Sequence, residues 1–253
     1  MRNIAIIAKN TLKEVIRDKI LYSILGFALL FILSTLFLGS ISLGEDLKVI
    51  RDLGLAGIYI FSLIIAIFMG TSLIYKEIDK RTLFITLSKP VSRSEFIIGK
   101  FFGLFVGLII TVLLMSIIYF LIVAFKGGVF DWRGLISISL SLIEIAIFIS
   151  LSILFSTFSK PLASTIYSVL ILYIGHSLNM VMSHFEKSGG ISLYAVKFVY
   201  YIFPNLEKFN LRNLVIYDAA ISGVEITLSV LYGVIYCIVL LLLAIWSLRK
   251  QEL

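Results

Sequence analysis

Six long runs of apolar residues follow one another along the chain, and only the fourth contains a charged residue. They cover residues 20–43, 53–75, 101–125, 135–159, 162–185 and 226–248. A helix of about 20 apolar residues crosses the hydrocarbon core of a bilayer, which is about 30 Å thick. The pattern therefore predicts an all-α integral membrane protein with six transmembrane helices, in which residues 1–253 form a single membrane domain.

The residues before the first run, 1–19, follow a different pattern. Apolar residues from Ile4 to Ile16 recur at helical spacing, whereas Lys9, Lys13 and Arg17 step by four along another face. This pattern is typical of a basic amphipathic helix that lies in the membrane interface. The alternative is a positively charged anchor that only orients the first span.

A segment of mixed character, residues 186–225, separates the fifth and sixth runs. Within it, residues 191–203 are apolar and rich in aromatic side chains, but they include Lys197 and are too few to span a bilayer. We expect interfacial or re-entrant helices in this outer segment. Pro204 should end the first of them, and Asn205 should start the next turn.

The composition excludes a water-soluble fold. Apolar residues make up 60% of the chain and charged residues only 15%, against about a quarter in soluble domains. With the N-terminus inside, 14 of the 22 Lys and Arg residues fall on the cytoplasmic side. This asymmetry predicts a multi-pass protein with both termini in the cytoplasm, and it explains the net charge of +7 without nucleic-acid binding.

Residues 76–100 form the longest cytoplasmic loop, with nine charges and one proline. Pro90 should break any helix within it, and Ser92 or Ser94 could cap the helix that leads into the third span. The loop is far longer than two neighbouring helices need. This length favours a docking surface over a simple solvated turn.

Three glycines open the third span at intervals of four residues. Gly99, Gly103 and Gly107 therefore share one face of a helix. Such a face lets a second helix approach closely. The approaching helix could belong to the same subunit or to a second copy.

Glu144 is the one charged residue within the six apolar runs. A carboxylate at this depth costs several kcal/mol unless it is paired, protonated or in contact with water. Two interpretations follow. Glu144 could belong to a translocation pathway, or it could be protonated and bonded to a neighbouring helix with the help of hydroxyls such as Ser139 or Ser141.

A polar face also occurs on the fifth span. His176, Met180 and His184 are spaced by four, and Asn179 lies beside them. Two imidazoles and a thioether would suit copper, but a metal-free polar face is the favoured interpretation. We therefore place Glu144, His176 and Asn179 in a possible translocation pathway and expect no metal site.

The sequence offers no catalytic motif. Gly99-Lys100 is followed by Phe101, and Ser94 stands where a phosphate-binding loop would need its first glycine. Cys237 is the single cysteine, so neither a disulfide nor a cysteine metal cluster can form within the chain. We expect no enzymatic activity and no cofactor in this chain.

The 76–100 loop resembles the corresponding loop in permease subunits of ABC-2-type ATP-binding-cassette transporters. The resemblance is strongest to the branch with nitrous oxide reductase maturation and gliding-motility permeases. It rests on Lys76-Glu77, Arg81-Thr82-Leu83, Leu87-Ser88-Lys89-Pro90-Val91-Ser92-Arg93, Glu95 and Gly99-Lys100.

This resemblance implies that the loop couples the membrane domain to a separate cytoplasmic ATPase subunit, which would hold ATP and Mg²⁺. The coupling residues would be Glu77, Thr82, Pro90, Arg93 and Glu95. The other partners would be membrane lipid and a second copy of the chain or a related permease, in a prokaryotic inner membrane, with export as the direction. The alternative is an ATP-independent transporter or channel that moves ions or protons by way of Glu144.

Overall fold

The computed structural model describes residues 2–41, 45–79, 91–128, 131–188, 191–216 and 222–250. Within these ranges the chain forms helices and no strand, and six helices are long and apolar enough to cross a membrane. The predicted all-α membrane fold is thereby confirmed. The helices are α1 (Arg2–Arg17), α2 (Lys19–Ile41), α3 (Asp46–Leu73), α4 (Tyr75–Asp79), α6 (Arg93–Phe125), α7 (Trp132–Ser156), α8 (Pro161–Ser188), α9 (Ile191–Ile202), the 3-10 turn η1 (Leu206–Phe209), α10 (Arg212–Ile216) and α11 (Gly223–Lys250).

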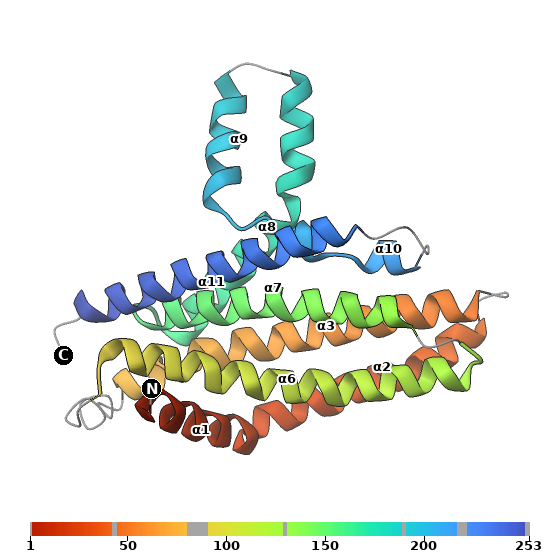
Figure 1. Cartoon of the computed structure of the whole chain (residues 1–253), viewed down its shortest axis with the longest axis horizontal. Coiled ribbons are helices and arrows are strands. Elements are labelled where there is room, and N and C mark those ends of the chain that lie inside the picture. The colour runs from red at the N-terminus through yellow and green to blue at the C-terminus, as the bar shows by residue number, and fades with distance from the viewer. Residues whose placement is uncertain are drawn as a thin grey trace.

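The spanning helices form an elongated bundle (Figure 1). Helices α3, α6, α7 and α11 run lengthwise beside one another, and the start of α1 lies at the same end as the end of α11. Helices α3 and α7 are the most enclosed, whereas α2 and α8 are the most exposed. Many of their exposed side chains are large and apolar, as Phe37 and Leu162 illustrate. In a bilayer such side chains contact acyl chains.

Several helices extend beyond the apolar runs that predicted them. Helix α3 begins at Asp46, ahead of the run at 53–75, and α6 begins at Arg93, ahead of the run at 101–125. An uncharged run marks only the part of a helix that can lie in the hydrocarbon core of a bilayer. The helix itself continues beyond the run where its polar side chains have water, ion-pair or hydrogen-bond partners. At α6 the start is fixed by a capping box between Ser92 and Glu95, which confirms Ser92 as the cap.

The three glycines of α6, which we call the glycine row (Gly99, Gly103 and Gly107), receive α1. A Cβ on these glycines would lie within 2.5–2.8 Å of side-chain atoms of Ile7, Thr11 and Val15, respectively. Both sets step by four in the same direction, so α1 runs parallel to the first turns of α6. The helix predicted to approach the glycine row is therefore α1 of the same subunit. Its placement relative to a membrane surface stays a prediction.

Gly103→Ala is expected to loosen α1 from α6. The new Cβ would lie 2.5 Å from the Thr11 Cβ and 2.6 Å from the Ala8 carbonyl oxygen, and the latter belongs to backbone that cannot rotate away. Overpacking of this kind costs about 1–3 kcal/mol. Thermal unfolding in detergent should show the loss. The matched control is Gly26→Ala in α2, where no atom of the described residues lies within 4 Å; equal stability of the two variants would contradict the prediction.

The outer segment folds back onto the bundle after leaving it. Helix α9 and the end of α8 form a hairpin that stands away from the bundle (Figure 1). Helix α9 ends at Ile202, shortly before Pro204, and Asn205 precedes η1 as predicted. Leu206 and Phe209 of η1 are then completely or almost completely buried. The short helical turn thus packs against the bundle, whereas α9 stands away from it, and the position of this segment relative to a membrane stays a prediction.

Candidate functional site

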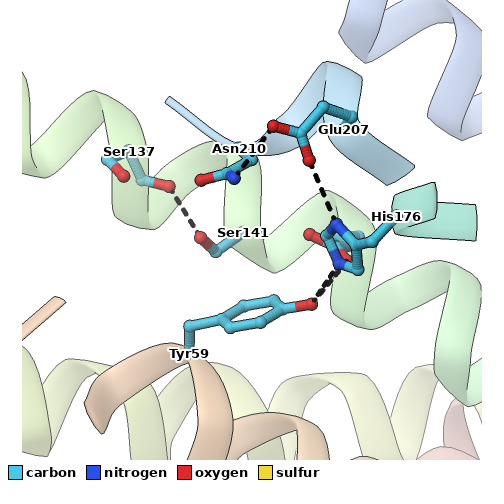
Figure 2. A network of polar contacts seen from close by, with 7 residues as sticks. Tyr59, Ser137, Ser141, His176, Glu207 and Asn210 are labelled. Atoms are coloured by element: carbon cyan, nitrogen blue, oxygen red, sulfur yellow. Dashed lines mark hydrogen bonds and ion pairs between the residues drawn. The ribbon is translucent and has the colours of Figure 1, made fainter. Parts of the chain in front are cut away.

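Four polar side chains from four separate elements meet inside the bundle. Tyr59 of α3 donates a hydrogen bond to Glu144 Oε1 of α7 at 2.6 Å. The Nε2 atom of His176 on α8 lies 3.0 Å from both Glu144 Oε1 and the Tyr59 hydroxyl. The other imidazole nitrogen, Nδ1, lies 3.4 Å from Glu207 Oε2 of η1. We call these four residues the intramembrane cluster (Figure 2).

Gly175 positions the η1 turn, which supplies Glu207. A Cβ on Gly175, the residue before His176, would lie 2.6 Å from Leu206 side-chain atoms and 2.7 Å from the Pro204 carbonyl oxygen. Glycine at this position lets η1 pack directly on α8. The short distance between the two backbones brings Glu207 within reach of His176.

Tyr59, Glu144 and His176 of the intramembrane cluster line a cavity of about 200 Å³. Ser137 and Ser141 of α7 line one side, and Asn210 and Arg212 line the side that follows η1. Glu144 is only 2% exposed although it contributes to the wall. A buried carboxylate at the edge of a polar cavity, with an imidazole and a phenol beside it, can bind a cation or exchange a proton.

The partners of Glu144 differ from the hydroxyls considered from the sequence. The hydroxyls of Ser139 and Ser141 donate to carbonyl oxygens of their own helix, Leu135 and Ser137, at 2.8 and 2.9 Å. A serine inside a membrane helix usually donates in this way, because the carbonyl oxygen four residues earlier lies within hydrogen-bonding distance. The bond to a neighbouring helix comes instead from Tyr59, which the sequence analysis did not single out.

Asn179 lies one turn beyond His176 on α8 but does not reach the cavity. Its Oδ1 accepts a hydrogen bond from Asn205 Nδ2 at 2.6 Å, and the same Asn205 amide also donates to the Tyr200 hydroxyl at 3.0 Å. Tyr232 of α11 accepts from the Asn205 backbone N–H. Through this hydrogen bond, Asn179 stabilises the turn between α9 and η1. A role in the translocation pathway stays a prediction for this residue.

The residues of the polar face on the fifth span have separate surroundings. Both ring nitrogens of His176 contact carboxylates, those of Glu144 and Glu207. Met180 points outward, with 79% of its surface exposed. Across the described ranges, no group of three or more His, Cys, Asp and Glu residues is arranged to hold a metal ion.

A second polar cluster lies where α1, α4 and α6 meet. The Lys100 ammonium group of α6 pairs with Glu14 of α1 at 3.3 Å and also contacts Glu77 of α4. The lysine side chain is only 5% exposed. We call these three residues the ion cluster. It joins the two described flanks of the 76–100 loop to each other and to α1.

The remaining predicted coupling residues fall around the start of α6. The Arg93 side chain donates to the carbonyl oxygens of Leu248 and Arg249 at the end of α11, both at 2.8 Å. Glu95 closes the capping box and accepts from Asn3 Nδ2 at 3.3 Å. Thr82 and Pro90 lie outside the described residues. The described coupling candidates thus bind α1, α6 and α11 together at one end of the bundle.

The comparisons with known proteins bear on these features. A search of curated proteins finds no match. A family model described as ABC-2 family transporter protein matches residues 5–253. The match includes all six apolar helices, the η1 turn and both polar clusters. This protein therefore belongs to the ABC-2 family of transporter proteins.

Proposed function

We propose that this permease is driven by a separate cytoplasmic ATPase subunit that docks on the 76–100 loop. The ion cluster carries the proposal. Glu77 and Lys100 lie on the two sides of the loop and contact each other, and Glu14 brings α1 to the same lysine. A force applied to the loop would therefore act on α1 and α6 together.

The contacts of Arg93 extend this surface to a further spanning helix. Its guanidinium binds the last carbonyl groups of α11, where the negative end of the helix dipole favours a cation. Movement of the start of α6 would therefore pull on α11 as well. Nucleotide-driven motion of a docked ATPase could change the tilt of several spans at once by this route.

The rest of the assembly follows from the same proposal. ATP and Mg²⁺ would be bound by the ATPase subunit, and this chain would contribute no catalytic residue. A second membrane half, most simply a copy of this chain, would complete the pathway. The complex would sit in a prokaryotic inner membrane with both termini of this chain in the cytoplasm, where it would export its substrate.

Purification in mild detergent from the native host tests this assembly. We expect a stoichiometric ATP-binding-cassette subunit to be present, identified by mass spectrometry, and ATP hydrolysis that depends on this chain. Complexes that contain the permease without any ATPase, under conditions that preserve other transporters of this kind, would contradict the proposal.

The intramembrane cluster supports one other function, ion or proton transport without ATP. Glu144 and His176 form a pair of titratable groups inside the membrane domain. Proton relays in membrane proteins are usually built from such residues. Uptake or release in ATP-free vesicles that follows the proton gradient would favour this function. Transport that requires ATP hydrolysis would favour the coupled permease.

A further inference from the structure

The face of α1 that points away from the bundle is basic. Lys9, Lys13 and Arg17 are all exposed, and their spacing of four places them on one face of the helix. Each step of four residues rises about 6 Å, so the three side chains are spread over about 12 Å of helix. We call these three residues the basic row.

The packing of α1 on the glycine row fixes the direction in which the basic row points. Ile7, Thr11 and Val15 lie against α6. Each member of the basic row stands two positions after one of these residues, and two positions correspond to a rotation of about 200° around the helix. The basic row therefore lies on the side of α1 opposite to α6. It cannot turn toward the bundle unless the two helices separate.

The two acidic residues near the end of α1 are engaged by lysines of the bundle. Glu14 pairs with Lys100 at 3.3 Å, and Asp18 lies 3.9 Å from Lys76. Both acidic residues stand three positions after a residue that packs on α6, so they lie on the side of α1 that faces the bundle. Their negative charge is thus directed to the bundle, and the positive charge of the basic row faces outward.

The register of α1 against α6 places the basic row near the level at which the apolar spans begin. Val15 lies against Gly107, which belongs to the uncharged run of α6 at 101–125. Helix α2 begins at Lys19, and its apolar span starts at Leu21. The end of the basic row is therefore close to the starts of two spans. Phospholipid head groups lie at this level of a membrane helix.

Two exposed isoleucines lie on the same outward face of α1. Ile6 stands three residues before Lys9, and Ile16 stands three residues after Lys13, with 51% and 41% of their surfaces exposed. Basic residues with apolar side chains between them suit the boundary between head groups and acyl chains. Together with the level of the basic row, this mixture favours a lipid surface over the acidic surface of a soluble protein.

We propose that the basic row binds the phosphate groups of anionic phospholipids and holds the outward side of α1 against the membrane surface. The bias of Lys and Arg toward the cytoplasmic side accounts for charges on one side of the membrane, but it does not require them to share one face of a helix. The arrangement also reverses that of a typical interfacial helix, whose apolar face enters the lipid. In α1 the apolar face is bound to protein, and the basic face is left for the lipid.

The lipid preference of the complex in nanodiscs tests the proposal. The complex as purified is reconstituted in mixtures of phosphatidylglycerol and phosphatidylcholine. A bimane fluorophore is attached at Ala5→Cys, an exposed position of α1, after Cys237→Ala has removed the natural thiol. Each lipid in turn carries a nitroxide near the top of one acyl chain, and quenching reports which lipid lies next to α1. We expect phosphatidylglycerol to quench more strongly than its mole fraction predicts.

A triple variant and two controls locate the preference. A basic residue near an anionic surface strengthens its binding by about fivefold, so the combination of Lys9→Gln, Lys13→Gln and Arg17→Gln should bring the two lipids close to equal quenching. Lys13→Arg keeps the charge and should keep the preference. Lys160→Gln removes an exposed lysine between α7 and α8 at the same end of the bundle and should also leave it unchanged.

Equal quenching by the two lipids in the natural protein would overturn the inference, and so would an unchanged preference in the triple variant. A triple variant that keeps the preference but loses its ATPase subunit would instead show that the basic row docks a protein. The ATPase content is measured in the same samples, so the lipid result and the coupling proposal are decided separately.

Discussion

Lys100→Met is expected to lower transport-coupled ATP hydrolysis by about tenfold. Methionine keeps the length of the side chain but removes the buried ammonium group that Glu14 and Glu77 share. Removal of the ammonium group leaves two carboxylates that are 47% and 21% exposed, so water screens part of the cost. The remaining cost is about 1–2 kcal/mol and falls on the contacts that join α1 and α4 to α6. The measurement is substrate-stimulated ATPase activity of the reconstituted complex.

Two control variants distinguish a loss of coupling between the ATPase and the spans from a general effect of a lost positive charge. Lys100→Arg keeps the cation and should retain most of the stimulation. Lys76→Met removes a lysine whose side chain is 48% exposed and which pairs with Asp18 only at 3.9 Å. Exposed pairs of this kind contribute little. If substrate stimulates the ATPase activity of Lys100→Met as strongly as that of Lys76→Met, the ion cluster does not transmit force from the 76–100 loop to α1 and α6.

Asp131→Ala should produce the largest loss of stability at the opposite end of the bundle. The Asp131 carboxylate is 4% exposed and caps α7 by accepting from the Gly134 N–H at 3.0 Å. Its other oxygen accepts from the buried Tyr119 hydroxyl at 2.9 Å and lies 3.5 Å from Arg51 Nε. Alanine would leave a largely buried guanidinium and a buried hydroxyl without their acceptor, at a cost of about 3–5 kcal/mol. Unfolding in detergent micelles measures this cost.

Glu45→Ala is the control for Asp131→Ala. Glu45 also precedes a spanning helix and pairs with a cation, Lys48, but both side chains are more than half exposed. We expect a change below about 1 kcal/mol. A similar loss in the two variants would show that Asp131 acts only as a surface charge.

The sequence predicted those features that depend on local chemistry. The length of the apolar runs is set by the thickness of a bilayer, so six spans followed directly. Ser92 was recognisable as a cap because Glu95 stands three residues later. Pro204 marked the end of α9 because proline cannot continue a helix.

The sequence alone could not predict the features that depend on which helices are neighbours. Glu144 and His176 could be singled out because polar residues are costly in an apolar run. Tyr59 and Glu207 could not be assigned to them, since a tyrosine is common in membrane helices and a glutamate is unremarkable in an outer segment. The glycine row likewise predicted a close neighbour, but small side chains do not encode that the neighbour is α1.

The packing of α1 on the glycine row has a consequence for biosynthesis. Asn3 and Glu95, which join the two helices, are 92 residues apart in the chain. At about 5–20 residues per second, roughly 5 to 20 s pass between their synthesis. During that interval the apolar face of α1 has no groove to occupy, and a membrane surface is the nearest place that can cover it. The basic, amphipathic character of α1 thus suits a nascent chain that must wait on the bilayer until its third span has been inserted.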